Sequence, residues 1–411
     1  MFEHATFSGT IGFREELFPI SFSVNVDVSC RLNIDCDPLP VEAFRHLRQA
    51  CGRPGEISQA LTLRGRSEDG HWTFSSTDIE VRGYRLAPSG YRIDVFALAA
   101  GLTSTISDTE VSLLRFRLRG YKSIPHAPIA TALGTLMVRG SGRPADADEV
   151  CGVIELKQQH KNDFPDWTCQ ADAMIGFVHR GICFGRGNRS QVPVTECIHG
   201  GALELVFYSG PSSPPGLAVI PPFDQQRFLE ALVRRHESST AFPSALWTVV
   251  GWLQSDTGFD EGRFLVAMTA LETVLGCVLS VDNYVAPKAD FEVLRDQLLT
   301  TVKCFSIGED SRAIFEGKVR GLNQRSFSQK IDSLIRRYAL PTDVFSEEAI
   351  KSIIKLRNDV VHRGVVASRG PMWESVLLVR DLVSRVILRE LDYNGSHESY
   401  THLYAKQHSK A

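Results

Sequence analysis

A change of hydrophobic period at one point in the chain is the feature that most constrains its fold. Residues 209–222 read SGPSSPPGLAVIPP, and such a cluster of proline, glycine and serine is typical of a boundary between domains. Before this cluster apolar and polar residues tend to alternate, and after it apolar residues recur every three to four positions. The pattern predicts an α+β protein with a β-rich part followed by an all-α part.

The first part, residues 1–209, has the alternation that half-buried antiparallel strands require. Between residues 22 and 34 every second residue is apolar, which predicts one continuous strand. Further strands are predicted at residues 72–81, 91–97, 111–118, 135–138, 153–157, 174–179 and 202–208, and a short helix at 41–50. We therefore expect an antiparallel sandwich or barrel-like domain, whose strand order the sequence does not give.

Beyond the Pro-rich linker at residues 210–222, the helical period predicts a bundle over residues 223–393. Its helices are expected at residues 224–236, 243–254, 260–279, 289–304, 311–321, 326–338, 346–363 and 372–391. A polar tail at residues 394–411 is expected to fray. The formal net charge is −3, so binding of a nucleic acid would depend on local basic patches.

The helix predicted at residues 346–363 carries polar residues in unusual positions. Ser346 is a suitable N-cap, and Gly364 stands where a C′ glycine ends a helix. A core-facing side is marked by Ile350, Ile353 and Ile354. Continued by one turn and then a second, that side includes Arg357, Asn358, Val361 and His362. Polar groups at such positions need hydrogen-bonding partners or a chemical role.

The sequence Arg357-Asn358-x-x-x-His362 resembles the arginine–polar–spacer–histidine motif of HEPN domains, helical modules best known as metal-independent ribonucleases. The order of the helices is also similar to that of the ApeA-like branch of this family. A helix containing Ala-Leu-Glu at residues 270–272 comes first, residues 327–335 follow, and a long apolar-striped helix comes after the motif. The resemblance covers residues 223–393. The β-rich half resembles, more loosely, the N-terminal domain attached to that branch.

The resemblance implies a homodimeric endoribonuclease whose composite active site forms where the motif helices of two protomers meet. It also implies a role in antiviral defence, as a toxin-like abortive-infection effector that cuts an RNA such as tRNA or mRNA. A free ribonuclease would harm its host. The β-rich half is therefore expected to sense an unidentified phage or cellular trigger, or to restrain the nuclease.

The residue types in the motif suit cleavage of RNA, which carries its own nucleophile in the ribose 2′-hydroxyl. Histidine titrates near neutral pH, so His362 is assigned as the general acid or base. The planar guanidinium of Arg357 matches two phosphate oxygens and is expected to stabilise the phosphate. Asn358 shares a helix face with His362 and would orient the phosphate or the imidazole. Glu272, on an earlier helix, would pair with Arg357 or steady His362.

Two other interpretations of these residues need no catalysis. Arg357 and Glu272 would form an ion pair that ties two helices together. His362 would interact favourably with the C-terminal dipole of its helix. The corresponding alternative function is a non-catalytic HEPN-fold module for RNA binding or dimerisation. The intact pair of Arg357 and His362 favours the nuclease.

Candidate RNA-contacting residues follow from local charge. Residues 312–337 hold seven basic and two acidic side chains, which is a local excess of five positive charges. The predicted contacts are Arg320, Arg325, Lys330, Arg336, Arg337 and Arg363. In the β-rich half, the alternating Arg115, Arg117 and Arg119 and a basic hairpin tip predicted at residues 185–189 are interpreted as solvated surface.

We expect neither a metal ion nor a cofactor. Cys197 and His199 lack the paired spacing of a zinc site, and Gly181, Gly185 and Gly187 do not match a nucleotide-binding motif. The nine cysteines include no CxxC pair, which is typical of reduced thiols in a cytoplasmic protein, and the first ten residues do not resemble a signal peptide. The apolar run 264–281 contains Glu272, so it is predicted to be a buried helix, and no membrane partner is expected.

Overall fold

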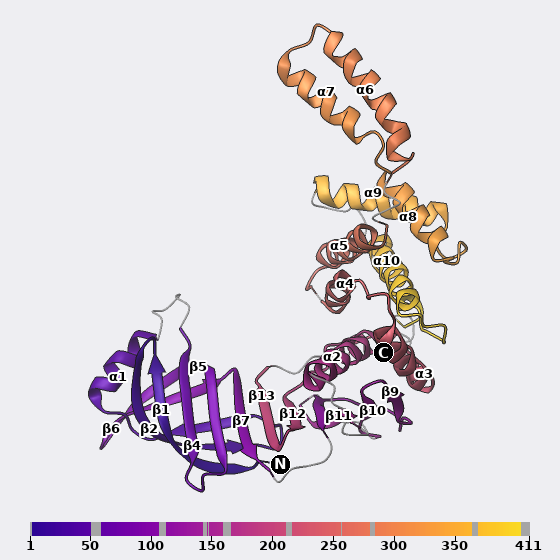
Figure 1. Cartoon of the computed structure of the whole chain (residues 1–411). Coiled ribbons are helices and arrows are strands. Elements are labelled where there is room, and N and C mark those ends of the chain that lie inside the picture. The colour runs from indigo at the N-terminus through magenta and orange to yellow at the C-terminus, as the bar shows by residue number, and fades with distance from the viewer. Residues whose placement is uncertain are drawn as a thin grey trace. The chain divides into compact units, whose positions relative to one another are not determined.

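The structure, a computed structural model, describes residues 2–50, 59–106, 112–142, 146, 148–158, 166–210, 216–255, 257–279, 284–363 and 369–403 (Figure 1). For residues 362–363 and 369–371 it describes the backbone alone. The chain divides into two compact units, Met1–Ser238 and Ser239–Ala411. The first contains an antiparallel barrel and sheet and the second is helical, which confirms the predicted order of a β-rich part and a helical part.

The described strands of the first unit form a single 13-stranded antiparallel sheet. They are β1 (His4–Phe13), β2 (Glu16–Val26), β3 (Leu32–Cys36), β4 (Leu61–Ser67), β5 (Trp72–Ala87), β6 (Gly90–Ala97), β7 (Ala99–Thr105), β8 (Leu113–Arg119), β9 (Ile129–Thr131), β10 (Gly134–Arg139), β11 (Val150–Lys157), β12 (Val194–His199) and β13 (Ala202–Tyr208). Short helical segments are α1 (Val41–Leu47), η1 (Arg48–Ala50) and η2 (Pro222–Asp224). The strand order is β4-β1-β2-β3-β6-β5-β7-β13-β12-β8-β11-β10-β9. An additional pairing of β4 with β5 closes the strands from β4 to β5 into a barrel.

Strand β5 belongs both to the barrel and to the open sheet. Its residues 72–75 pair with β7 and its residues 79–87 with β6, because β6 and β7 follow each other with only Leu98 between them. On its other side β5 pairs with β4. Strand β6 continues to β3 in the barrel, whereas β7 continues to β13 in the open sheet.

Aromatic rings fill the inside of the barrel. Phe7 and Phe22 stack with their ring centroids 5.3 Å apart, and Phe74 meets Phe22 edge-on at 5.3 Å. All three side chains are fully buried. Gly65 faces this cluster, and a Cβ there would lie 2.8 Å from the Phe22 ring. Burial of these large rings is a main source of stability for the barrel.

Residues 22–34 form a hairpin, so the prediction of one continuous strand is wrong. Strand β2 ends at Val26 and pairs with β3, which begins at Leu32. Between them, the carboxylate of Asp27 accepts hydrogen bonds from the backbone N–H groups of Ser29 and Arg31. An aspartate that binds its own backbone in this way forms a turn that needs neither glycine nor proline.

Helix α2 (Trp167–Arg186) stands where a strand was predicted at residues 174–179. That prediction is wrong because the run Met-Ile-Gly-Phe-Val-His has a β-like composition, whereas the longer segment has a helical period. Its buried positions include Ala171, Met174, Ile175, Val178 and Ile182. The helix contacts β8 and β11. At its start, the indole N–H of Trp167 donates to the Leu133 carbonyl at 3.0 Å.

The basic hairpin tip predicted at residues 185–189 is also wrong, because α2 continues through it. Gly185 and Arg186 are the last residues of the helix, and Gly187 ends it with a φ of +67°. A Cβ at Gly187 would lie 2.2 Å from the carbonyl oxygen of Leu217. Glycine is required there both by the left-handed backbone and by the close approach of a neighbouring chain segment.

Two glycines of α2 allow α3 (Gln225–Glu237) to lie close against it. A Cβ at Gly181 would lie 2.4 Å from a methyl carbon of Leu232, and one at Gly185 would lie 3.0 Å from the ring of Phe228. Helix α3 therefore belongs to the first unit, and the boundary between the units follows Ser238.

The short strand β9 ends the open sheet, and side chains of α3 hold the chain on either side of it. The side-chain oxygen of Gln226 accepts a hydrogen bond from the backbone N–H of Ala127 at 2.9 Å. The carboxylate of Glu237 accepts one from Ala132 at 2.7 Å. A short, flanked edge strand offers few free groups for pairing with another chain.

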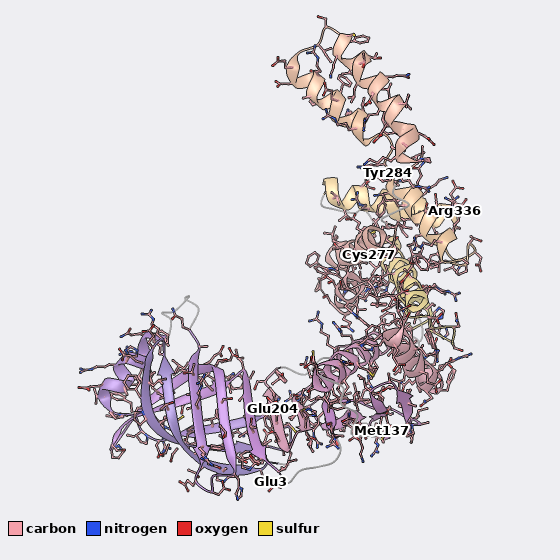
Figure 2. The ribbon with its side chains drawn as sticks, viewed as in Figure 1. Glu3, Met137, Glu204, Cys277, Tyr284 and Arg336 are labelled. Atoms are coloured by element: carbon pink, nitrogen blue, oxygen red, sulfur yellow. The ribbon has the colours of Figure 1, made fainter. Side chains whose placement is uncertain are left out.

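The second unit is built from helices. They are α4 (Ala245–Gln254), α5 (Asp260–Val278), α6 (Lys288–Cys304), α7 (Glu309–Gly321), α8 (Phe327–Arg337), α9 (Glu347–Arg363) and α10 (Arg369–Glu390). Each corresponds to a predicted helix to within three residues at either end. Helices α4 and α10 pack against α5, while α6 and α7 lie side by side as a hairpin (Figure 1). Figure 2 shows their side chains, with Cys277 of α5 and Arg336 of α8 labelled.

The described part of the C-terminal tail is packed, although the sequence predicts that it frays. Tyr393 and Tyr400 are each 3% exposed. The Tyr393 hydroxyl donates to the carbonyl of Ser396 at 2.7 Å. The guanidinium carbon of Arg380, on α10, lies 5.9 Å from the centroid of the Tyr400 ring. The two aromatic side chains therefore hold a polar segment against the helix.

Gly181→Ala is expected to lower the free energy of unfolding by about 1–3 kcal/mol, because the added methyl group overpacks the contact between α2 and α3. Gly176 of the same helix provides a matched control, since a Cβ there meets no atom within 4 Å. Gly176→Ala should raise stability by roughly 0.5–1 kcal/mol through its better helix propensity. Urea unfolding followed by circular dichroism measures both changes. Equal effects at the two positions would contradict the close approach of the helices.

Acid is expected to destabilise the first unit through its buried histidines. Burial lowers the pKa values of His126, His179 and His236. Below about pH 6.5 the unfolded chain therefore binds more protons than the folded one. The stability that depends on these histidines being neutral is fully present above that pH and is lost as the pH falls. The free energy of unfolding should decrease on acidification, and the slope should be smaller in His179→Gln. The control is His71→Gln, which makes the same substitution at an exposed histidine.

Candidate functional site

Helix α9 begins as its sequence predicts. The Ser346 hydroxyl accepts a hydrogen bond from the backbone N–H of Ala349 at 3.3 Å. Glu347 and Glu348 occupy the first turn, where the helix dipole favours negative charge. The described helix ends at Arg363, and Gly364 lies outside the described residues.

The core-facing side of α9 differs from the predicted one. Its buried residues include Ile350, Ile353, Leu356 and Val360. Arg357 lies at the border of this side, Asn358 is exposed, and Val361 is 54% exposed. The predicted continuation of the core-facing side through Asn358 and Val361 is wrong. An α-helix has about 3.6 residues per turn, so positions chosen three or four residues apart move gradually round the helix, and the direction of the core cannot be extended over several turns from spacing alone. The described polar residues of the motif are therefore accessible to a ligand.

Arg357 is held by residues of two other helices. Its Nε and Nη2 groups both donate to the Oε1 atom of Glu272, at 3.1 and 2.9 Å. Its Cζ atom lies 5.3 Å from the ring centroid of Phe327. The Arg357 side chain is nevertheless 33% exposed, and that of Glu272 is 46% exposed. A guanidinium fixed along one edge and open to solvent is suited to binding an oxyanion.

Phe327 is a site residue that the sequence analysis does not identify. Ser326 and Gln329 form a capping box that starts α8, and Phe327 is the first residue of that helix. A cation–π contact at an exposed position contributes roughly 0.5–1 kcal/mol and restricts the orientation of the guanidinium. The signal in the sequence is an aromatic residue directly after a serine N-cap. Nothing in the sequence relates that residue to Arg357.

The described geometry covers part of the predicted catalytic set. Arg357 and Glu272 are in direct contact, and Asn358 is exposed beside Arg357 on α9. Position 362 lies one helical turn after Asn358. The side chains of His362 and Arg363 lie outside the described residues.

Glu272 belongs to an exposed stripe on α5. The stripe consists of Leu265, Thr269, Glu272 and Gly276, which recur at helical spacing. Leu265 is 41% exposed, and a Cβ at Gly276 would meet no atom within 4 Å. The Arg357–Glu272 pair therefore lies on a surface with small and apolar residues, which includes the exposed Val361 one turn beyond Arg357.

The predicted RNA-contacting residues are divided between several elements. Arg320 of α7 pairs with Glu316 of the same helix at 3.1 Å. Arg325 lies between α7 and α8, where it donates to the Tyr284 carbonyl at 2.9 Å and to the Ser333 hydroxyl at 2.5 Å. These contacts hold the Arg325 guanidinium in place, whereas the Arg320 side chain remains 64% exposed.

The other predicted contacts within the described residues lie on α8. Lys330 is half-buried, while Arg336 and Arg337 are exposed near the end of the helix. Arg336 is labelled in Figure 2. The Cζ atom of Arg337 lies 5.8 Å from the ring centroid of Tyr338. These two arginines place exposed positive charge at the C-terminal end of α8.

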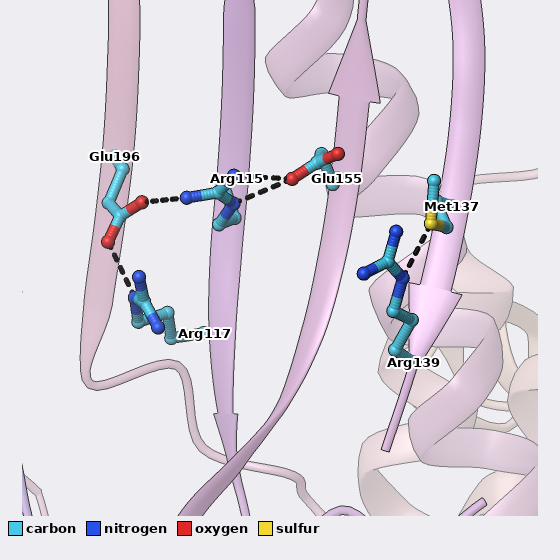
Figure 3. A network of polar contacts seen from close by, with 6 residues as sticks. All are labelled: Arg115, Arg117, Met137, Arg139, Glu155 and Glu196. Atoms are coloured by element: carbon cyan, nitrogen blue, oxygen red, sulfur yellow. Dashed lines mark hydrogen bonds and ion pairs between the residues drawn. The ribbon is translucent and has the colours of Figure 1, made fainter.

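Two arginines of β8 have their partners on the neighbouring strands (Figure 3). Arg115 lies opposite Glu155 of β11 and Glu196 of β12, and pairs with them at 2.5 and 2.6 Å. Arg117 also pairs with Glu196, at 2.5 Å. Arg119 is 4% exposed and donates to backbone carbonyls. The interpretation of Arg119 as solvated surface is therefore wrong, and the other two arginines are neutralised across the strands.

Cys183 and His179 of α2 lie close together but do not form an activated nucleophile. The Sγ atom of Cys183 lies 3.5 Å from His179 Nε2, and that nitrogen lies 2.8 Å from the Ser190 carbonyl oxygen. A carbonyl only accepts, so His179 Nε2 carries the proton and has no lone pair to receive one from the thiol. Burial raises the pKa of Cys183 to about 11, which disfavours the thiolate.

Within the described residues, no group of three or more His, Cys, Asp or Glu side chains is placed to hold a metal ion. No described helix has the length and the apolar content that a membrane span requires. Comparison of the chain with protein-family models, curated proteins and solved structures gave no match.

Glu272→Gln is expected to change the free energy of unfolding by less than about 1 kcal/mol, because both members of its pair with Arg357 are substantially exposed. Asp381 provides the contrast, since its carboxylate is 3% exposed and pairs with Arg385 at 3.0 Å. Asp381→Asn should cost about 3–5 kcal/mol. Thermal and urea unfolding would compare the two. A cost at Glu272 as large as that at Asp381 would mark the Arg357–Glu272 pair as a structural tie between α5 and α9.

Proposed function

We propose that this protein is a metal-independent endoribonuclease of the HEPN type, which cuts RNA by attack of the ribose 2′-hydroxyl on the adjacent phosphate. The observation that supports it best is the state of Arg357. Glu272 and Phe327 fix its guanidinium, yet a third of the side chain remains exposed beside the exposed Asn358. Such an arginine is prepared to bind a phosphate without having to order its own side chain.

The proposed reaction needs the movement of two protons and the stabilisation of added negative charge. The 2′-oxygen forms a bond to phosphorus, and the bond from phosphorus to the 5′-oxygen breaks. A base takes the 2′-hydroxyl proton and an acid protonates the 5′-oxygen, which gives a 2′,3′-cyclic phosphate and a 5′-hydroxyl. His362 is assigned to proton transfer, and Arg357 offsets the charge of the phosphorane. Asn358 orients the phosphate or the imidazole.

A second copy of the chain would complete this site. One imidazole does not act as base and acid on opposite sides of the phosphate at the same moment, whereas two motif helices that meet across a two-fold axis supply two. The exposed apolar side chains of Leu265 and Val361 support such a contact, because Leu265 shares the exposed stripe of Glu272 and Val361 lies one turn beyond Arg357. The absence of a side chain at Gly276 allows a close approach of a second backbone.

The biological role in this proposal is that of an anti-phage abortive-infection effector. It rests on the resemblance of the motif helices to the ApeA-like HEPN branch. A ribonuclease that acts on its own cell's RNA needs restraint, and the first unit is the part of the chain assigned to that task or to recognition of a trigger.

A non-catalytic HEPN-fold module for RNA binding or dimerisation is the second candidate. The direct contact between Arg357 and Glu272 favours this candidate, because an ion pair that joins α5 to α9 has a structural role without any substrate. The two functions differ in their dependence on His362, which a binding module does not require.

His362→Ala is expected to reduce cleavage of total RNA or tRNA by about 10²–10⁴-fold in excess EDTA, because it removes the group that transfers protons. Arg357→Lys should also reduce cleavage, since an ammonium lacks the planar fork that matches two phosphate oxygens. Lys355→Ala is the matched control on an exposed face of α9 and should keep the native rate. Gel analysis of the fragments and their termini provides the measurement.

Circular dichroism and size-exclusion chromatography of each variant establish that it folds and assembles like the native chain. Equal cleavage by the native chain and His362→Ala would place the activity elsewhere or in a contaminant. Binding of RNA without cleavage by either would support the non-catalytic module.

A further inference from the structure

The α6–α7 hairpin exposes more apolar surface than a monomeric globular protein of this kind normally does. Helix α6 has 17 residues, and none of them is buried. Val293 is 64% exposed and Leu294 is 49% exposed. On α7, Ile314 is 60% exposed and Phe315 is 49% exposed. Two short helices whose main described contact is with each other bury little of their apolar surface, so a further partner would stabilise this pair.

The base of the hairpin is fixed by specific hydrogen bonds. The side-chain amide of Asn323 donates to the Ala286 carbonyl at 2.9 Å, and its oxygen accepts from the Ala286 N–H at 2.8 Å. Tyr284 and Gln324 form an antiparallel bridge beside it. The start of α6 and the end of α7 adjoin this bridge and form the base of the hairpin.

The base and tip halves of each helix differ in net charge, and the order of the signs on α6 is the reverse of that on α7. Near the base, residues 288–296 of α6 carry two positive and three negative side chains, a net of −1, and residues 316–321 of α7 carry two positive and one negative, a net of +1. Toward the tip, residues 297–304 of α6 carry one positive charge, and residues 309–315 of α7 carry one positive and two negative, a net of −1. Each helix is neutral as a whole, but its two halves have opposite sign.

We propose that the hairpin is a self-association surface. The hairpins of two copies of the chain lie side by side with their bases at the same end, and α6 of one copy lies along α7 of the other. In this arrangement the acidic base of α6 meets the basic base of α7, and the basic tip of α6 meets the acidic tip of α7. Every neighbouring pair of helices is antiparallel, as in an up-down-up-down four-helix bundle. Parallel contact of α6 with α6 would instead place like charges together.

The dimensions and the charge fit a second hairpin. Helix α6 is about 25 Å long from its 17 residues, and two helices side by side are roughly 20 Å wide. A face of that size is about 500 Å², and two such faces reach the roughly 1,000 Å² in total that a specific interface needs. The neutral total charge of each helix gives little attraction for a nucleic acid or an anionic membrane. This contact is separate from the α5–α9 contact of the proposed nuclease and does not depend on it.

The test uses one pair of charge reversals in the full chain. Asp290 lies in the first turn of α6 and Lys318 in the last turn of α7, so both are at the base of the hairpin. In the proposed arrangement they meet at one level between the copies. Asp290→Lys places two positive groups at this level in its own homodimer, and Lys318→Glu places two negative groups there. A mixed pair of the two chains restores attraction in both contacts between the copies. It leaves the mismatch inside each hairpin, so rescue reports the intermolecular contact alone.

A tagged Asp290→Lys chain is mixed at low salt with one untagged chain at a time. The amount of untagged chain retained with the tagged chain is measured at increasing concentrations of the untagged chain. We expect it to bind the Lys318→Glu chain about tenfold more tightly than it binds an untagged copy of itself. Asp343→Lys makes the same charge change at an exposed position outside the hairpin, and that chain should bind itself as the native chain does.

Equal retention of the two untagged chains would overturn the proposal, even where a contact through α5 and α9 keeps the chains associated. A native chain that is monomeric by light scattering at the concentrations of the assay would overturn it as well. Loss of ribonuclease activity in His362→Ala has no bearing on either result, so the two proposals fail independently.

Discussion

Strand β5 sets the geometry of the first unit, because it is hydrogen-bonded to three other strands. One side of it pairs with β4 and closes the barrel. The other side pairs with β6 and β7, which then diverge toward β3 and β13. A register shift between Val81 and Gly83 allows the strand to bend within its pairing with β6. A change that weakens β5 is therefore felt in both the barrel and the open sheet.

The arginines of this chain show why positive charge in a sequence does not identify a binding surface. Arg115 is matched by two carboxylates directly opposite it, and Arg119 is buried against backbone carbonyls. Arg186 likewise donates to the carbonyls of Gly120 and Lys122. Arg357 differs from these, because its partners hold only one edge and leave the side chain a third exposed. Exposure alone does not separate them, because the Arg115 side chain is itself 27% exposed. Arg357 differs from Arg115 in having one carboxylate partner in place of two.

The helices of the second unit could be predicted because apolar residues keep the helical period through most of them. Helix α2 was missed because Met174 to His179 combines aromatic and β-branched residues, and only the longer pattern from Ala171 to Ile182 is helical. The hairpin at residues 22–34 was missed because its turn depends on the Asp27 side chain, with no glycine or proline to mark it. Alternation alone does not distinguish one strand from two strands joined by such a turn.

The candidate site could be predicted in part. The contact of Glu272 with Arg357 follows from two polar residues on helices that pack together. The exposure of Asn358 and the position of Phe327 depend on how α9 is rotated against α5 and α8, which tertiary packing decides. The sequence specifies the chemical groups of the site, and the packing of three helices specifies which of them a ligand can reach.

The hydrogen bonds that flank β9 have a consequence for the order in which the chain is made. Ala127 and its partner Gln226 are 99 residues apart in sequence. A ribosome that adds about 5–20 residues per second completes α3 roughly 5–20 s after it has made β9. During that interval the end of the open sheet lacks the side chains that later hold it. Newly made chains are thus most open to wrong strand pairing, and most in need of a chaperone, before the first unit is fully synthesised.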